Sequence, residues 1–384
     1  MELLVLYSII FFSIIIFLLY IYLVFEKIYT SIKEILKQKY LKEVSAYLDE
    51  LIYRLDEENI NETEIEKMKM FMKHKIRREI VEDRMVYYFE NFKGILTKKL
   101  TKICEDIGLI DYEIEKLKHR DLYKIALACK NLGEFRSKKA IHPLLNLVTN
   151  PSTDVKYNVL LALAKIGDEE AFIEAFKKLS KTIPLSERSL IEIADNFEGD
   201  KLYVYKSLIY IDDDFISSTF IKSAGNYKDM ALADDIALFL NSENKEKKIA
   251  ALRALGNMGD NRYVEAMINL LNDKEWEVRA VAAKALGQIQ DSRALLPLVK
   301  ALSDQQWYVR YNAAYSLINI EGGLDMARLI FQGDDKFAKD IIISVLETSY
   351  GWDKLLEYES VNDQSPKLSD LVKEYIKTRQ VVTA

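Results

Sequence analysis

The chain has 384 residues, of which 49% are apolar and 30% are charged. This balance fits a folded protein with well-solvated faces rather than a disordered one. Only 13 Gly and 5 Pro interrupt it, which favours helices over a strand-rich fold with frequent turns. The net charge of −6 disfavours a nucleic-acid groove, which requires a basic surface, so no nucleic-acid partner is expected.

The first predicted element is a transmembrane helix. Residues 3–25 read LLVLYSIIFFSIIIFLLYIYLVF, 23 residues without a charge. At 1.5 Å per residue such a helix is about 35 Å long, enough to cross a hydrocarbon core of about 30 Å. A secretory signal peptide would have a basic start and a small-residue cleavage site, and the segment has neither. Residues 1–25 are therefore predicted to be a retained anchor.

The charges that flank this helix predict its orientation. Only Met1 and Glu2 precede it, and cytoplasmic flanks of membrane helices are rich in Lys and Arg. We therefore expect a single-pass protein of the cell membrane with its N-terminus outside and the rest in the cytoplasm. The lysines that follow the helix are also predicted to attract anionic lipid: Lys27, Lys33, Lys37, Lys39 and Lys42.

Residues 26–94 are predicted to form a helical stalk. Apolar residues recur every three or four positions from Ile28 to Leu55, which indicates an amphipathic helix continuous with the anchor. The run DEENINETE at 56–64 interrupts it, and a second helical stretch is expected to reach about Phe92, with Asn61 and Glu64 as its capping pair.

A basic cluster lies within that second stretch. One interpretation is functional: the cluster contacts the anionic inner leaflet of the membrane or an acidic partner. Its alternative is a solvated helix face, paired with Glu64, Glu66, Glu79 and Glu82. The cluster contains Lys67, Lys69, Lys73, His74, Lys75, Arg77 and Arg78.

Residues 95–384 are predicted to form a repeat domain, clearest over 245–333. An irregular first repeat, broken at Gly108, is expected to cap it. KKIAALRALGNMGDNRYVEAMINLLND at 247–273 is followed, 31 residues on, by VRAVAAKALGQIQDSRALLPLVKALSD at 278–304. Each unit predicts two helices of about three turns, whose apolar faces are buried by stacked neighbours. The expected fold class is all-α, a right-handed α-solenoid.

The pattern VRxxAAxALGxxxDxxA resembles the HEAT-like repeat first recognised in phycocyanobilin lyases and shared by many bacterial scaffold proteins. The resemblance covers about residues 120–345 and implies a ladder between layers, here from Asp273 with Arg279 and Asp304 with Arg310. Upstream, Lys156 and Lys248 stand in place of the arginine and are expected to weaken this ladder. The anchor, stalk and repeats together resemble membrane-anchored HEAT proteins of low-GC bacteria, which implies a membrane glycosyltransferase of exopolysaccharide synthesis as partner.

No pattern of catalytic or metal-binding residues stands out. The chain lacks HExxH, GxSxG and P-loop motifs, and its three histidines lie far apart. Cys104 and Cys129 belong to no CxxC cluster and are predicted to be buried. The run at 212–214 is interpreted as helix capping and His142 as a helix-start residue. We therefore expect neither an enzyme nor a cofactor or metal site.

The candidate partner site lies at the start of the clearest inner helices. Aromatic and Arg side chains dominate interface energetics, so a concave edge that carries both predicts protein binding. The alternative is that Trp276 and Trp307 pack against the next repeat's turn. The candidate residues are Trp276, Arg279, Trp307, Tyr308, Arg310 and Tyr311.

Three classes of function follow from these features. The preferred one is a non-catalytic scaffold or adaptor that holds a protein partner at the inner membrane surface. The second is a repeat-protein enzyme, either a pigment lyase/isomerase, which a visible tetrapyrrole band would reveal, or a DNA glycosylase, which salt-sensitive DNA binding would reveal. The third is a structural membrane protein that self-associates, which the oligomeric state would reveal.

Overall fold

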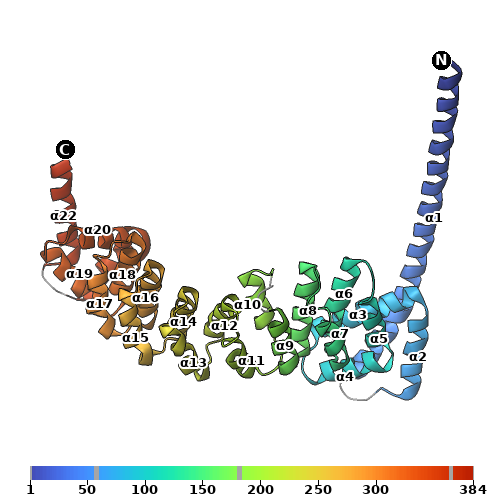
Figure 1. Ribbon diagram of the computed structural model, residues 1–384, viewed down its shortest axis with the longest axis horizontal. Helices are drawn as coiled ribbons and strands as arrows, with labels where there is room; N and C mark the ends of the chain where they lie inside the picture. The colour runs from blue at the N-terminus through green and yellow to red at the C-terminus, as the bar shows by residue number, and fades with distance from the viewer. Residues whose placement is uncertain (1, 56–59, 180–183, 363–365, 384) are drawn as a thin grey trace. The chain divides into compact units, whose positions relative to one another are not determined.

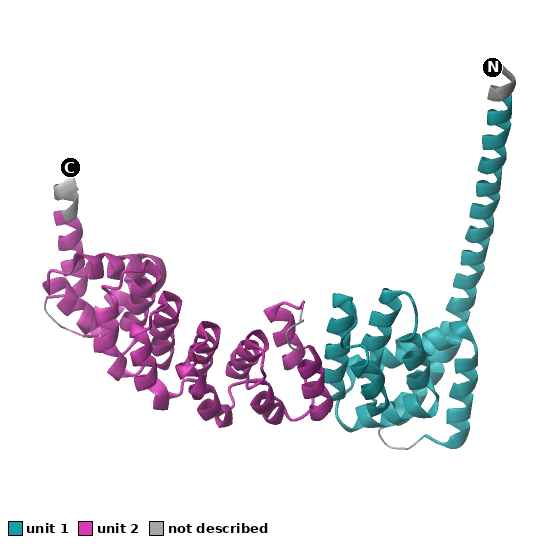
Figure 2. Ribbon diagram, in the orientation of Figure 1, with its two compact units in different colours: residues 1–168 teal, residues 169–384 magenta. Residues whose placement is uncertain are grey.

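The structure is a computed structural model that describes residues 2–55, 60–179, 184–362 and 366–383 (Figure 1). These residues form helices and turns, and no strand occurs among them, so the predicted all-α class is confirmed. The chain divides into two compact units, Met1–Asp168 and Glu169–Ala384 (Figure 2).

Unit 1 begins with one long helix. α1 (Glu2–Arg54) is uninterrupted, which confirms that the apolar segment and the first part of the stalk form a single helix. Its side chains from Leu6 to Leu36 are exposed, except for the partly buried Ile15 and Ile21, and from Val44 onward it buries Leu48 and Leu51. Of the interrupting run at 56–64, residues 56–59 lie outside the described residues.

The second stalk helix is broken where a continuous one was expected. α2 (Glu62–Lys73) ends at His74, whose extended backbone (φ −104°, ψ 123°) also precedes α3 (Lys75–Asn91), so the prediction of one stretch to Phe92 was wrong. The break lets α3 pack against both α1 and α2. The capping pair is confirmed, because Asn61 Oδ1 accepts from the Glu64 N–H at 2.9 Å and Glu64 Oε2 accepts from the Asn61 N–H at 3.1 Å.

The rest of unit 1 is a group of shorter helices. The predicted break at Gly108 is confirmed, because this residue adopts φ 77° between two of them. The elements are α4 (Ile95–Asp106), α5 (Leu109–Lys116), α6 (Leu122–Phe135), a 3-10 turn (Lys138–Ala140), α7 (Ile141–Leu145) and α8 (Thr153–Ile166).

Unit 2 starts with three helices and then repeats a pair of unequal ones. The longer members pack directly on one another and form what we call the long-helix layer: α12 (Asp214–Tyr227), α14 (Lys245–Met258), α16 (Trp276–Ile289) and α18 (Trp307–Asn319). The shorter members are α13 (Ala233–Ala237), α15 (Val264–Asn269) and α17 (Leu295–Ala301). The flanking helices are α9 (Glu169–Leu179), α10 (Glu187–Asp195), α11 (Lys201–Leu208), α19 (Gly323–Gln332), α20 (Lys336–Val345), α21 (Trp352–Val361) and α22 (Leu368–Thr383).

The shorter helices are less regular than predicted. Instead of three α-helical turns, α15 has six residues between 3-10 turns at Asn261–Tyr263 and Leu270–Asn272. Asp260 begins this segment by accepting the Arg262 N–H at 3.0 Å. A 3-10 turn rises about 2.0 Å per residue against 1.5 Å in an α-helix, so these turns lengthen a short segment without adding residues.

The long-helix layer has a close-packed core of small residues. The predicted face is confirmed, because Val278, Ala282, Ala283 and Leu286 all have 0% exposure. Glycines at the same repeat position let the backbones approach, and at Gly225 a Cβ would lie 2.3 Å from the Ala254 Cα. The long-helix layer is therefore a closely packed support for the side chains that it exposes to solvent.

Candidate functional site

Four of the six predicted partner-site residues form one aromatic cluster, defined as Trp276, Trp307, Tyr308 and Tyr311. Tyr308 contacts both tryptophans, with ring centroids 5.8 Å from Trp276 and 5.2 Å from Trp307. Trp307 in turn stacks on Tyr311 at 5.0 Å. The tryptophans begin α16 and α18, so stacking of the repeats brings these four rings together.

Two rings of the aromatic cluster are exposed, although contacts hold the cluster in position. Trp307 is 46% and Tyr308 is 61% exposed, so both rings offer apolar area to solvent. The Tyr311 hydroxyl lies 2.5 Å from Ser349 Oγ and 3.1 Å from Thr348 Oγ1, and these hydrogen bonds lower the pKa of Tyr311. Rigid, exposed aromatic side chains lose little conformational entropy on binding, which is typical of interface anchors.

The two predicted arginines hold the repeats together. Arg279 Nε and Nη2 donate to the two carboxylate oxygens of Asp304 at 2.7 and 2.9 Å, and its Nη1 donates to the Asp273 carbonyl at 3.0 Å. Arg310 Nη1 donates to the Asp304 carbonyl at 2.7 Å. The guanidinium N–H groups of both arginines therefore point at the loops that precede α16 and α18 rather than at solvent.

A ladder between layers is present, but each carboxylate pairs with the basic residue of the preceding repeat rather than, as predicted, with the arginine that follows it in the chain. Lys248 Nζ donates to Asp273 at 2.6 Å, a single bond where Arg279 makes two to Asp304. Burial is the largest single influence on Asp304 and opposes its ionisation, but the hydrogen bonds from Arg279 and the Gln306 N–H, together with the nearby arginine charges, outweigh burial and lower the pKa of this carboxyl. The next aspartate in register, Asp335, instead accepts from Ser303 Oγ at 2.6 Å.

The sequence analysis missed two further features of the long-helix layer. Arg253 and Lys284 are exposed at equivalent positions of α14 and α16. One turn later, Asn257 Nδ2 donates to Asn226 Oδ1 at 3.4 Å and Gln288 Nε2 donates to Asn257 Oδ1 at 3.0 Å, which forms a row of carboxamides. The 31-residue offset that aligned the core residues also aligns these positions, so reading the exposed positions at that offset would have found them.

The basic residues near the predicted membrane surface fall into two groups. In the cluster on α2 and α3, Arg77 pairs with Glu43 at 3.1 Å and Lys69 with Glu66 at 2.8 Å, while Lys67 lies 3.8 Å from the centroid of the Tyr47 ring. Much of this cluster is therefore engaged within unit 1. The lysines of α1 form no ion pair among the described residues: Lys27, Lys33, Lys37, Lys39 and Lys42.

The carboxyl of Glu113, whose pKa is strongly raised, belongs to a buried polar cluster in unit 1. Lys116 Nζ donates to Glu82 Oε2 at 2.7 Å and to Glu113 Oε1 at 2.6 Å, and Asn131 Nδ2 donates to Glu82 Oε1 at 2.8 Å. Burial, and secondarily the nearby Glu82, raises the pKa of Glu113 to about 8. Glu113 has 0% exposure, so the cluster links α3, α5 and α6 in the interior rather than facing solvent.

We expect Glu113→Gln to flatten the pH dependence of stability. Because the folded-state pKa is about 8 against an ordinary value of 4.5, the folded protein retains a proton that the unfolded chain releases. The stability contributed by this group is therefore full below about pH 4.5 and falls as pH rises toward 8. Urea unfolding of the full-length protein in detergent between pH 5 and 8 measures this slope.

The exposed Glu115 provides the matched control for this measurement. It pairs with Lys118 at 2.6 Å on the surface, so Glu115→Gln should leave the slope as in the wild type. Parallel slopes for the wild type and Glu113→Gln would contradict a raised pKa at Glu113.

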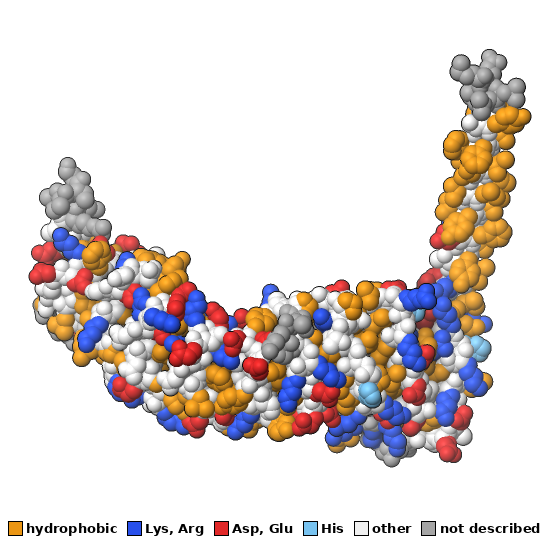
Figure 3. All heavy atoms as spheres, in the orientation of Figure 1, with side chains coloured by type: hydrophobic (Ala, Val, Ile, Leu, Met, Phe, Trp, Pro, Cys, Tyr) orange, Lys and Arg blue, Asp and Glu red, His pale blue; other side chains and the backbone are white. Residues whose placement is uncertain are grey.

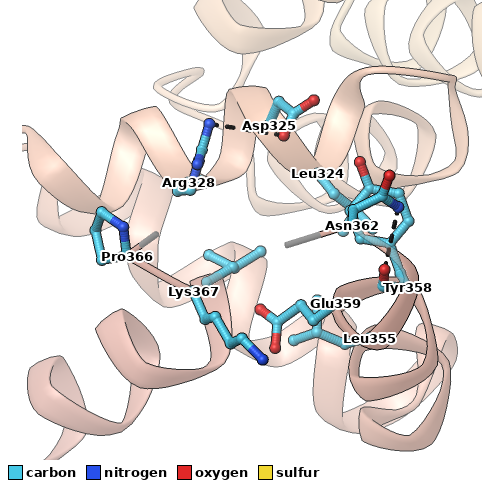
Figure 4. A pocket seen from close by; sticks show the side chains of 10 residues that line it. Leu324, Asp325, Arg328, Leu355, Tyr358, Glu359, Asn362, Pro366 and Lys367 are labelled. Atoms are coloured by element: carbon cyan, nitrogen blue, oxygen red, sulfur yellow. Dashed lines mark hydrogen bonds and ion pairs between the residues drawn. The ribbon is translucent and has the colours of Figure 1, made fainter. Parts of the chain in front are cut away.

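Unit 2 also contains two cavities that the aromatic cluster does not line. The first, about 20 Å³, is lined by Leu324, Arg328 and Glu359 among others (Figure 4). A volume of this size holds about one water. The second, about 240 Å³, lies beside Pro297 and Asp304.

The remaining candidate residues have structural positions. Cys104 and Cys129 are buried as predicted, and burial raises both thiol pKa values, that of Cys129 to about 12. Asp213 caps α12 by accepting the Ile216 N–H at 3.0 Å, and His142 is the second residue of α7. In the described part of the chain, no group of three or more His, Cys, Asp or Glu is placed to hold a metal ion.

Comparison with known proteins decides the repeat type. A family model described as HEAT repeats matches residues 111–189 and 233–318. This chain contains HEAT repeats. The second matched range covers α14, α16 and nearly all of α18, so the aromatic cluster lies on HEAT repeats. No curated protein matches the sequence.

Solved structures with similar folds include natural and engineered proteins. An engineered protein is 18% identical with a TM-score of 0.34, and the match covers 83% of this chain and 99% of that one. The complex of CpcE and CpcF of phycocyanin lyase from Nostoc sp. PCC7120 is 20% identical with a TM-score of 0.29, covering 69% and 94%. A Kap121p mutant is 13% identical with a TM-score of 0.44, covering 82% and 45%.

Proposed function

We propose that this protein is a membrane-tethered, non-catalytic adaptor whose aromatic cluster docks a protein partner. The observation that carries the proposal is that Trp307 and Tyr308 remain exposed within a cluster of stacked rings on the long-helix layer. Aromatic anchors on a rigid support are typical of binding hot spots. Since Arg279 and Arg310 are engaged by the loops, we assign recognition to the rings and only the shape of the site to the arginines.

The properties of α1 support the tether. Its apolar segment has a mean hydropathy of 2.8 and is 0% buried, and Figure 3 shows apolar side chains covering this part of the helix. Burying such a surface in lipid removes it from water. The unpaired lysines from Lys27 to Lys42 support placing the repeats on the cytoplasmic side.

Tethering makes a weak docking site sufficient. Confinement to the same membrane raises the effective concentration of a membrane-bound partner, so the intrinsic contact can be small. We therefore propose a membrane protein as the partner. The resemblance to membrane-anchored HEAT proteins extends this proposal to a glycosyltransferase of exopolysaccharide synthesis.

A photo-crosslinking amino acid at Gln306 tests the docking site. Gln306 is exposed and immediately precedes Trp307, so irradiation of native membranes should give a discrete adduct. Trp307→Ala/Tyr308→Ala should reduce that adduct more than about tenfold, because hot-spot side chains contribute about 2 kcal/mol or more each. The matched position is Leu296 on α17, which is 65% exposed and should give no such adduct. Adducts that persist in a folded double variant would refute the site.

A further inference from the structure

The basic residues of the long-helix layer differ in whether they have a partner within the protein. Six of the eight on its four helices have partners within the protein: Lys222 with Glu187, Lys245 with Glu277, Lys247 with Asp214, Lys248 with Asp273, Arg279 with Asp304, and Arg310 with backbone carbonyls. Arg253 and Lys284 form no hydrogen bond or ion pair in the part of the chain that the structure describes, and both are exposed. We call these two residues the cation pair.

The cation pair occupies a defined place on the layer. Residues four apart lie on one face of a helix, so α16 places Lys284 and Gln288 on the same face, while Trp276 lies two turns before Lys284 at the start of this helix. At 1.5 Å per residue, Lys284 lies about 12 Å along the helix from Trp276 and about 6 Å from Gln288. The aromatic cluster, the cation pair and the carboxamide row are therefore three successive bands across adjacent repeats.

The spacing of the cation pair indicates the shape of its ligand. Arg253 and Lys284 lie at equivalent positions of α14 and α16, which pack directly on each other. Packed helices are separated by about 8–10 Å. An extended segment in the polyproline II conformation has three residues per turn and rises about 3.1 Å per residue, so carboxylates three residues apart lie on one side of it and are separated by about 9 Å. Two acidic side chains with two residues between them therefore match the two cations.

The neighbouring bands supply what such a segment also requires. A carboxamide has two donors and an acceptor oxygen, so the row of Asn226, Asn257 and Gln288 retains hydrogen-bonding capacity for a peptide backbone after forming its internal bonds. The exposed rings of Trp307 and Tyr308 offer apolar contact on the other side. Two free cations are too few for a phosphate backbone, whose binding relies on many neutralised charges.

We propose that the long-helix layer of unit 2 binds an extended acidic segment of a protein, with its carboxylates on Arg253 and Lys284 and its backbone beside the carboxamide row. This inference rests on the proposed function, because it names the chemistry of the partner that the aromatic cluster anchors. Charge contacts at an exposed face are screened, so binding should weaken as the salt concentration rises.

The test uses full-length protein in neutral phosphatidylcholine nanodiscs and a short fluorescein-labelled peptide with glutamate at every third position and a terminal tryptophan. Fluorescence anisotropy should show binding of this peptide and weaker binding of its glutamine and lysine counterparts. Arg253→Glu/Lys284→Glu should reduce affinity for the glutamate peptide about tenfold or more, equivalent to about 1.4 kcal/mol, and should create affinity for the lysine peptide.

A matched variant separates this site from a general effect of charge. Lys300→Glu makes the same charge reversal on α17, at an exposed lysine of the same repeat as Lys284, and should leave binding unchanged. Circular dichroism before each titration confirms that the variants are folded. Equal binding of the glutamate and glutamine peptides, or tighter binding to duplex DNA or to phosphatidylglycerol vesicles, would overturn the proposal.

The outcomes also separate this inference from the adaptor function. If the Gln306 adduct forms and depends on Trp307 and Tyr308, but charge reversal changes neither the adduct nor peptide binding, the acidic-segment proposal fails while the docking site stands. If no adduct forms and the tryptophan of the peptide contributes nothing, the docking function itself fails.

Discussion

Replacing Ile14 and Phe17 with aspartate is expected to release the protein from the membrane. Both residues lie near the centre of the apolar segment and are more than half exposed, so no protein contact compensates for their loss. An aspartate at the centre of a membrane helix costs about 3 kcal/mol on the insertion scale, or about 6 kcal/mol for the pair. Most of the protein should then move from the carbonate-washed membrane pellet to the soluble fraction.

Two controls define this result. Ile14→Leu/Phe17→Leu retains the apolar surface and should stay in the pellet, as should Leu296→Asp, which places an acid on an exposed residue of α17. Orientation is measured in a Lys300→Cys variant, because Cys104 and Cys129 are fully buried and should not react. An impermeant maleimide should label Cys at position 300 only after cell lysis. Retention of the double-aspartate variant in the pellet would contradict the tether.

Gly225→Ala should destabilise unit 2 strongly. The added methyl would lie 2.3 Å from the Cα and 2.6 Å from the Cβ of Ala254, and the first of these is a backbone atom that cannot rotate away. α12 must then separate from α14, which opens the layer below the carboxamide row. Overpacking of this kind costs about 3 kcal/mol. The thermal unfolding midpoint of the full-length protein in detergent, followed by circular dichroism, measures the loss.

Gly333→Ala is the matched glycine replacement. Its added methyl would have the Ile330 carbonyl oxygen as its nearest neighbour, at 3.5 Å, and its backbone has a negative φ of −86°. The change should therefore stay within about 0.5 kcal/mol. Equal midpoints for Gly225→Ala and the wild type would show that the helices do not approach as closely as described.

The repeat architecture could be predicted from the sequence because its periodicity is strong. The 31-residue offset aligned small and apolar residues on one helix face, and the structure confirms this face at Val278, Ala283 and Leu286. It did not predict the break at His74, because neither Gly nor Pro marks it and the apolar spacing continues through it. The 3-10 turns around α15 were missed for a similar reason, since i+3 and i+4 spacings are hard to distinguish in a short segment.

The site was predicted in part. The proximity of the aromatic residues followed from the repeat offset, but the position of Tyr308 between Trp276 and Trp307 depends on side-chain directions that a sequence does not specify. The availability of Arg253 could not be predicted either. A basic residue is identified as unpaired only when its neighbours in space are known, and the partners of Lys222 and Arg279 come from other repeats.

The continuity of α1 sets a distance from the bilayer. With residues 3–25 in the membrane, the helix continues without a hinge to Val44, the first of its side chains with no exposed surface. Val44 is the nineteenth residue after Phe25, which at 1.5 Å per residue places it about 28 Å further along the axis. The packed part of unit 1 would then stand clear of the lipid headgroups, which suits a client whose cytoplasmic portion projects well beyond the membrane surface.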